Sequence, residues 1–384
     1  MDLSYILNEL GEERHLYFNA VAPPVMQTSN FTFNTVDEFR EALNNEFDAN
    51  LYSRGQNPTI NILRQKLAAL DGAEDALVFG SGIAAIAVPA IALLQQGDHV
   101  VCVENPYSWT VKLFSKLLPR FGVTTTFVNG TDIRNFENAL QSNTRLIYLE
   151  SPNTFSYELQ DLAAIAQLAK TKQIITLMDN SYCSPLYQQP IKMGIDLVAQ
   201  SATKYIGGHS DVVAGVLTGS KALIRKIFEL EYMNIGASLS PHSAWLLIRG
   251  LRTLPLRLQR SFESTATITG WLQRHPLIDE VIWPFSPGFP QAGLAKQQMQ
   301  GCGGLFSFTL KNPSAQKITA FCNNLKHILM AVSWGGHESL IIPAIATISP
   351  DEYDATNRRH NLVRMYVGLE DPAYLIKDLE QALG

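Results

Sequence analysis

Hydrophobic residues in the first two thirds of the chain gather in short runs that are separated by amphipathic stretches. Six of these runs are rich in β-branched residues: Ala76–Phe79, His99–Val103, Thr124–Val128, Leu146–Leu149, Ile174–Met178 and Leu197–Ala199. Such runs, alternating with helical stretches, are typical of βαβ units, in which helices cover both faces of a parallel sheet. The pattern therefore predicts an α/β domain built on a parallel sheet.

The pattern changes on either side of this segment. The first ~50 residues lack clear periodicity, and Pro23-Pro24 favours an extended arm. Beyond Ser240-Pro241, a long helical stretch runs through Gln273, and Leu305–Leu310 alternates with the period of a strand, which indicates a smaller α+β domain. We therefore expect three units: an N-terminal arm that contacts a partner subunit (1–50), a large domain (51–240) and a C-terminal small domain (241–384).

Composition narrows the possible partners. The formal net charge is −5 and there is no Lys/Arg-rich run, so neither nucleic acid nor a membrane surface is expected to bind. Hydrophobic residues make up 46% of the chain and charged residues only 17%, which suggests that a homo-oligomer buries further surface between its subunits. A small molecule is the expected ligand.

The sequence also bears on the compartment. Its start lacks a secretory signal, and the longest apolar stretch, near Ile83–Leu94, is well short of the ~20 residues of a spanning helix. The four cysteines lie far apart without the spacing of a metal site, so we expect reduced core thiols and no metal. These features predict a cytoplasmic protein.

Lys204 lies shortly after the last of the six runs, in the segment Ser201-Ala-Thr-Lys. Ligands of open α/β sheets bind beyond the carboxyl ends of the strands. A buried ammonium is costly unless it is paired or modified, and formation of a Schiff base removes the charge. Ser201 and Thr203 offer hydroxyls that can bind phosphate beside such a linkage. The alternative is a lysine that extends its ammonium to solvent.

Two further strand ends supply groups that a phosphorylated pyridine cofactor needs. Gly80-Ser81-Gly82-Ile83 ends a strand and opens a helix, whose N–H groups and dipole favour phosphate. Asp179 follows the run Ile174–Met178 and can keep a pyridinium nitrogen protonated. Glycines also serve tight turns, and a lone aspartate before Ser181 can form an Asx turn. Together with Lys204, these residues point to pyridoxal 5'-phosphate.

Eight motifs follow one another along the chain: YSRGQNPT (52–59), FGSGIAAIA (79–87), ESPNTFSYELQD (150–161), MDNSY (178–182), SATKYIGGHSD (201–211), RGLRTLPLR (249–257), SWGGHESLI (333–341) and VRMYVGLEDP (363–372). The series resembles the Cys/Met-metabolism (trans-sulfuration) family of pyridoxal-phosphate enzymes, which includes cystathionine γ-synthase, cystathionine β- and γ-lyases and methionine γ-lyase. The resemblance implies fold type I, which is aspartate-aminotransferase-like. A large α/β domain with a mostly parallel seven-stranded sheet is then followed by the smaller α+β domain.

The resemblance also implies roles for individual residues. Lys204 would carry the cofactor and move the substrate α-proton, and Tyr107 would stack on the pyridine ring and assist proton transfer. Tyr52 and Arg54 match a pair that reaches the cofactor phosphate from a neighbouring subunit, so active sites would be shared within a homotetramer, a dimer of dimers. Arg364 matches the arginine that binds the substrate α-carboxylate.

Several positions depart from the γ-active members of that family. Thr154-Phe155 replaces the usual Asn-Pro, and Asn153 lies one position earlier. Ser333-Trp334 resembles the form found in β-lyases. Val332 occupies a position at which cystathionine γ-synthases and γ-lyases usually have a glutamate, which is suited to holding the distal ammonium of cystathionine. Tyr107-Ser108-Trp109 replaces Tyr-Gly-Gly and should narrow the pocket above the ring. The expected substrate-binding residues are Asn153, Val332, Ser333, Trp334 and Arg364.

These features predict a carbon–sulfur lyase that eliminates a thiol from cystathionine-like or other thioether amino acids. Elimination at Cβ gives pyruvate, and elimination at Cγ gives 2-oxobutyrate. A γ-replacement transferase of the cystathionine γ-synthase or O-acylhomoserine sulfhydrylase type stays open. An aminotransferase and a catalytically silent cofactor-binding protein also stay open. Loss of Lys204, Asp179 or Arg364 would favour the silent protein, but all three residues are present.

Overall fold

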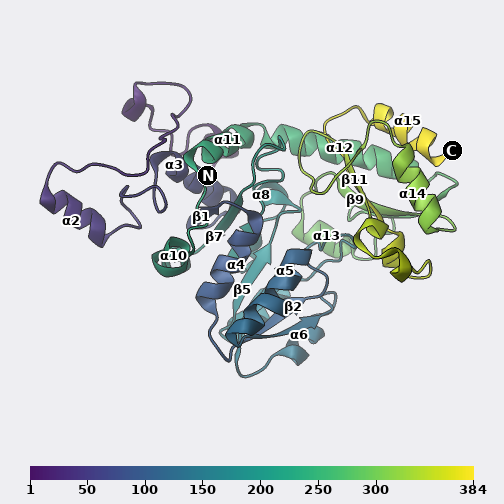
Figure 1. Ribbon diagram of the computed structural model, residues 1–384, viewed down its shortest axis with the longest axis horizontal. Helices are drawn as coiled ribbons and strands as arrows, with labels where there is room; N and C mark the ends of the chain where they lie inside the picture. The colour runs from purple at the N-terminus through teal and green to yellow at the C-terminus, as the bar shows by residue number, and fades with distance from the viewer.

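The computed structural model describes residues 1–384 and contains two sheets in separate lobes, with the long helix α12 leading from one to the other (Figure 1). The large sheet has seven strands in the order β1-β7-β6-β5-β4-β2-β3, and the small sheet has five in the order β10-β11-β12-β9-β8. The seven strands of the large sheet are β1 (Asp75–Phe79), β2 (His99–Val103), β3 (Thr124–Val128), β4 (Thr144–Glu150), β5 (Ile175–Asp179), β6 (Leu197–Gln200) and β7 (Gly215–Gly219). The strands of the small sheet are β8 (Ile278–Ile282), β9 (Leu305–Leu310), β10 (Leu329–Met330), β11 (Leu340–Pro343) and β12 (Val363–Tyr366).

Helices precede, alternate with and follow these strands. They are α1 (Leu3–Asn8), α2 (Val36–Asn44), α3 (Pro58–Asp71), α4 (Gly82–Leu93), α5 (Ser108–Lys112), α6 (Ile133–Ala139), α7 (Leu162–Thr171), α8 (Ser184–Tyr187), α9 (Lys221–Ile227), α10 (Met233–Ile235), α11 (Pro241–Arg252), α12 (Leu254–Leu272), α13 (Ala292–Gln298), α14 (Ala315–Asn324) and α15 (Pro372–Leu383). None of them combines the length and the apolar character that crossing a membrane requires.

The large sheet matches the predicted α/β architecture. β2 to β6 pair in parallel, whereas β7 pairs antiparallel with both β1 and β6. Successive strand residues point to opposite faces. In β4, Leu146 and Tyr148 pack in one core with residues of α4 and α9, while Ile147 and Leu149 pack in another with residues of α7. Helices therefore cover both faces, which leaves the strand ends as the accessible part of the sheet.

The helical stretch predicted after Ser240-Pro241 is two helices instead of one. α11 ends at Arg252, and α12 begins at Leu254 with Pro255 in its first turn. Proline has no backbone N–H and clashes with the preceding turn, so it is costly inside a helix and best tolerated in the first turn. The break at Thr253 thus follows from Pro255.

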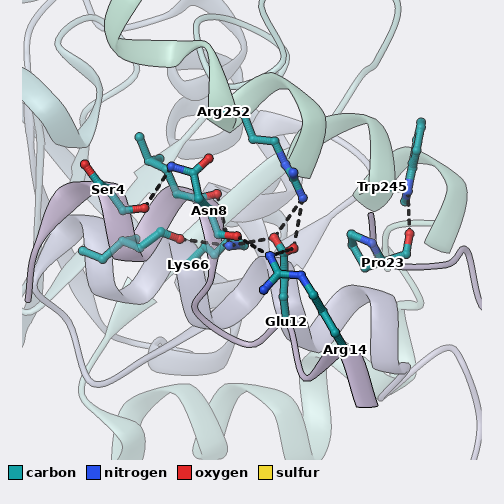
Figure 2. A network of polar contacts seen from close by, with 10 residues as sticks. Ser4, Asn8, Glu12, Arg14, Pro23, Lys66, Trp245 and Arg252 are labelled. Carbon is teal, nitrogen blue, oxygen red and sulfur yellow. Dashed lines mark hydrogen bonds and ion pairs between the residues drawn. The ribbon is translucent and has the colours of Figure 1, made fainter. Parts of the chain in front are cut away.

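The N-terminal segment is fastened to the chain's own large lobe (Figure 2). The buried carboxylate of Glu12 pairs with Lys66 Nζ of α3 at 3.1 Å and with Arg252 of α11 at 3.0 Å. Nearby, Trp245 Nε1 donates a hydrogen bond to the carbonyl of Pro23 at 2.8 Å. The following stretch, which carries α2, extends away from both lobes in Figure 1. This later part of the N-terminal region is free to reach another molecule.

We expect Glu12→Gln to lower the free energy of unfolding by about 3–5 kcal/mol, because it leaves the ammonium of Lys66 buried without its anion. Burial already lowers the pKa of Lys66, and Glu12 opposes that effect. Denaturant unfolding measures the change. Glu13→Gln is the matched control, since the Glu13 side chain is 66% exposed and its removal should shift stability by less than about 0.5 kcal/mol. Equal effects of the two substitutions would contradict a structural role for the buried pair.

Candidate active site

A cleft of about 1300 Å³ lies at the carboxyl ends of β4, β5 and β6, with residues of the small lobe on its other side. It brings together residues that are far apart in the sequence. The predicted site residues that line it are Ser81, Gly82, Ile83, Tyr107, Asn153, Asp179, Ser201, Thr203, Lys204, Val332, Ser333, Trp334 and Arg364. Tyr52 and Arg54 do not line it.

Lys204 lies at the base of this cleft, shortly after β6 ends. Its Nζ donates a hydrogen bond to Ser333 Oγ and lies 5.5 Å from the centre of the Trp334 ring. Burial, together with the positive charge of Arg364, lowers the pKa of Lys204 to about 8, although Asp179 opposes the shift. The amine therefore loses its proton as the pH rises through about 8, well below the pH at which an ordinary lysine does, and a nucleophile or base must lose it.

The Ser333-Trp-Gly-Gly segment is shaped around Lys204. Ser333 has a φ of +83°, a conformation that L-residues seldom adopt, and Gly335 has a φ of +90°. A Cβ atom on Gly335 would lie 2.8 Å from the Cα atom of Lys204. Glycine is thus required for the close approach that brings the Ser333 hydroxyl to the lysine.

Two carboxylates lie side by side at the ends of neighbouring strands, since Glu150, which is buried, pairs in register with Asp179, which is half-buried. Burial raises the pKa of both groups, and the Asp179 charge raises that of Glu150 further. One oxygen of Asp179 accepts a hydrogen bond from the Ser181 N–H at 2.8 Å, so the Asx turn considered above is present. A protonated pyridine nitrogen is a partner that would offset the cost of burying Asp179.

Glu150 is the residue that sequence reasoning missed. Its two oxygens accept hydrogen bonds from the backbone N–H groups of Tyr107 at 2.7 Å and Thr154 at 2.9 Å. It thus ties the loop that carries Tyr107 to the loop that contacts Arg364. Its position directly after a buried run, in the motif ESPN, was the available signal.

The turn between β1 and α4 is the segment predicted to bind phosphate. Ser81 is the N-cap of α4, and Gly82 is the first helical residue. A Cβ atom on Gly82 would lie 2.8 Å from Ser201 Cβ, so only glycine lets the helix N-terminus approach this strand end. The Thr203 hydroxyl donates to the Ala214 carbonyl at 3.1 Å and accepts from its N–H at 2.9 Å, which also fixes the loop before Lys204.

Arg364 is 8% exposed and has no carboxylate partner. Its Nη1 donates to Thr154 Oγ1 at 3.3 Å, and its guanidinium lies 4.8 Å from the centre of the Phe155 ring. Close by along the chain, Asn153 Nδ2 donates to the Glu104 carbonyl at 2.9 Å, while its buried Oδ1 has no partner. A buried, unpaired guanidinium is unfavourable, so this arrangement fits the binding of an external carboxylate.

Tyr107 and Val332 lie nearer the opening, where they are 44% and 82% exposed. Burial of part of the Tyr107 phenol, with the charges of Asp179 and Glu150, raises its pKa. Tyr52 and Arg54 lie outside the cleft, with the Arg54 guanidinium 5.2 Å from the centre of the Tyr52 ring. Within one chain, these two side chains therefore do not take part in the site.

These residues fit pyridoxal phosphate, because a Cβ atom on Gly82 would clash with Ser201 at the helix N-terminus that lines the cleft, and Asp179 faces the cleft without a cation in hydrogen-bond contact. The family model described as "Cys/Met metabolism PLP-dependent enzyme" matches residues 6–384, so the chain belongs to this family of enzymes and uses pyridoxal phosphate. The fold is type I, as predicted from the resemblance.

Named relatives are similar over most of their length. The chain is 39% identical to the L-methionine gamma-lyase of Pseudomonas deceptionensis, over 95% of this chain and 92% of that protein. It is 37% identical to the cystathionine gamma-lyase of Mus musculus, over 86% of this chain and 84% of that protein. The crystal structure of metB from Corynebacterium glutamicum matches with a TM-score of 0.91 at 32% identity, over 100% of this chain and 98% of that one.

Proposed function

We propose that this protein is a carbon–sulfur lyase that eliminates a thiol from a thioether amino acid. The observation that carries the proposal is the placement of Arg364 and Lys204 in one cleft. A buried guanidinium without a carboxylate can bind the substrate α-carboxylate, and the lysine faces the same space. The names of the similar proteins, L-methionine gamma-lyase and cystathionine gamma-lyase, support elimination as the reaction.

The cleft residues also suggest how the cofactor would be held. Lys204 would form the covalent link, Asp179 would keep the ring nitrogen protonated, and Tyr107 would cover the ring. Ser81, Gly82, Ile83, Ser201 and Thr203 would surround the phosphate. When bound, the cofactor supplies an electron sink that stabilises negative charge at the substrate Cα.

The protein's own groups would then position the substrate and move protons. Arg364 would fix the α-carboxylate, with Asn153 and Trp334 in the same cleft. Lys204, whose pKa is lowered to about 8, would accept the α-proton, and Ser333 Oγ, which accepts a hydrogen bond from its Nζ, would orient it. The net reaction consumes one water and yields a thiol, a 2-oxo acid and ammonium. The 2-oxo acid is pyruvate after β-elimination and 2-oxobutyrate after γ-elimination.

The identity of the 2-oxo acid tests this proposal. Incubation with methionine, cystathionine, cysteine and O-acylhomoserine should release a 2-oxo acid with an equal amount of ammonium and no need for an amino acceptor. The relatives favour 2-oxobutyrate. Pyruvate from cystathionine would instead support β-elimination, which Trp334 and Val332 favour. Formation of a thioether from O-acylhomoserine and cysteine, without 2-oxo acid, would contradict the lyase and support γ-replacement.

We further propose a cytoplasmic homotetramer, a dimer of dimers, whose active sites are shared. The support is that Tyr52 and Arg54 lie outside the chain's own cleft, while the stretch that carries α2 extends away from both lobes. Arg54 from a neighbouring subunit would bind the cofactor phosphate through its guanidinium fork, and Tyr52 would accompany it. Four buried free cysteines are compatible with a reducing compartment.

Subunit mixing tests whether the sites are shared. Arg54→Ala and Lys204→Ala proteins are each expected to have little activity, but hybrid dimers would contain one site in which both residues are intact. Activity should therefore recover after subunit exchange, and mass spectrometry can verify the exchange. No recovery in verified hybrids would place both residues in the site of one subunit.

A further inference from the structure

Three permanent cations line the outer part of the cleft: Lys112, Lys116 and Arg359. All three side chains are exposed, and none has a carboxylate within ion-pair distance in the structure. The acidic residues that line the same cleft are Glu150 and Asp179, which lie at the ends of β4 and β5, away from these cations. The opening is therefore positively charged.

Lys112 and Lys116 lie one turn apart, at the end of α5 and in the π-helical turn Leu113–Leu117 that continues it. Like charges at this spacing weaken a helix by a few tenths of a kcal/mol. Trp109 positions the ammonium of Lys112, since the Lys112 Nζ lies 4.1 Å from the centre of the Trp109 ring. Trp109 is 53% exposed and lines the cleft, so the pair holds an ammonium on the cleft wall.

Arg359 lies on the other wall, in the short helical turn Arg358–Asn361 of the small lobe. Its Nη1 donates a hydrogen bond to the side chain of Asn105, which precedes α5. The neighbouring Arg358 differs, because it forms an ion pair with Glu280 at 2.7 Å. Arg359 thus keeps its charge unpaired at a point where the two lobes meet across the cleft.

The other cations of the cleft already have partners in the proposed function. Lys204 would bind the cofactor, and Arg364 would bind the substrate α-carboxylate. The opening has no acid that could hold a distal ammonium, because Val332 lies there and is 82% exposed. A group bound by Lys112, Lys116 and Arg359 must be an anion.

We infer that the opening of the cleft binds an anionic group at the distal end of the substrate's sulfur substituent, so that the preferred substrate is a thioether amino acid whose leaving thiol carries a carboxylate and no ammonium. This inference rests on the proposed function and names its substrate class. Trp109 covers one side of the substituent and positions Lys112, while Lys116 and Arg359 add charge around the carboxylate.

A pair of substrates of equal size tests the inference with the holoenzyme. S-carboxymethyl-L-homocysteine carries the anion, and S-carbamoylmethyl-L-homocysteine is its neutral counterpart; the two corresponding L-cysteine derivatives cover β-elimination. The ratio of kcat/KM for acid over amide, measured by release of 2-oxo acid at low ionic strength, should be about tenfold, because several exposed charge contacts of less than 1 kcal/mol each add up. The ratio should fall as salt screens the charges.

The variant Lys112→Gln/Lys116→Gln should bring this ratio towards one. Lys377→Gln, an exposed lysine of α15 outside the cleft, is the matched control and should keep the wild-type ratio. Equal use of acid and amide by the wild type, or an unchanged ratio in the double variant, would overturn the inference while leaving the lyase intact. Release of no 2-oxo acid from any of the four compounds, while methionine or cystathionine does release it, would also overturn the inference and leave the lyase intact; release from none of these thioethers would overturn the proposed function itself.

Discussion

Lys204→Ala is expected to reduce turnover by roughly 10³-fold or more while leaving the fold in place, because it removes both the covalent link to the cofactor and the base that takes the α-proton. The wild-type protein should be yellow, and borohydride should remove this absorbance by reducing the lysine–cofactor imine. The variant should bind the cofactor without forming a link that borohydride traps. Lys172→Ala, an exposed lysine at the end of α7, is the matched control and should behave as the wild type.

The lowered pKa of Lys204 gives the same prediction a pH dependence. Only the neutral amine attacks a carbonyl, and the Lys204 amine becomes neutral as pH rises through about 8. The rate at which protein stripped of cofactor recaptures pyridoxal phosphate should therefore rise with pH and level off above about 8, whereas an ordinary lysine would not level off until near its pKa of about 10.4. Normal turnover by Lys204→Ala would refute the central role of this residue.

Arg364→Ala should chiefly damage the reaction with amino acids and spare cofactor binding. Loss of one partner of a desolvated ion pair costs about 2–5 kcal/mol. This corresponds to a roughly thirtyfold to several-thousandfold fall in kcat/KM, at about 1.4 kcal/mol per factor of ten. The fold should tolerate the change, because Arg364 has no anionic partner of its own and one hydrogen bond, to Thr154. The visible absorbance of the bound cofactor, recorded with and without substrate, distinguishes loss of substrate binding from loss of cofactor binding.

Arg364→Lys separates charge from shape. A lysine keeps the positive charge but cannot form the two parallel hydrogen bonds of a guanidinium, so it should recover little activity. Retained cofactor absorbance that no longer shifts when substrate is added would support the role in carboxylate binding. A colourless Arg364→Ala protein, or one with unchanged kcat/KM, would instead assign Arg364 to a structural role.

Most strands of the large sheet could be predicted closely because they are buried on both faces. A strand of this kind is largely apolar, so its run is visible without any knowledge of its neighbours. The edge strand β3 is partly exposed, and its run of β-branched threonines was the signal instead. The runs at His99–Val103 and Thr124–Val128 have the bounds of β2 and β3, and no end of the other runs differs from the end of its strand by more than two residues. β7 was missed, because it begins and ends with glycine, at Gly215 and Gly219, and such a segment is typical of a loop. It forms a strand because β1 and β6 pair with it on either side.

The site divides in the same way. The sequence determined the chemical groups of the cleft, because each of them occupies an unusual position that indicates a function. These groups are a lysine and an aspartate at the ends of apolar runs, a glycine turn before a helix and an arginine inside an apolar strand. What only the tertiary structure decided is which groups meet and which are already engaged. Asp179 and Glu150 are neighbours through strand register, and Ser333 reaches Lys204 across 129 positions of the chain.

The exclusion of Tyr52 and Arg54 from the cleft, and the unpaired cations at its opening, also depend on the fold. A local pattern records whether a position is buried, since burial follows from the period of the element that contains it. It does not record the distance between residues of different elements. That distance follows from packing of the two lobes, and it places Arg359 of the small lobe beside Asn105 of the large one.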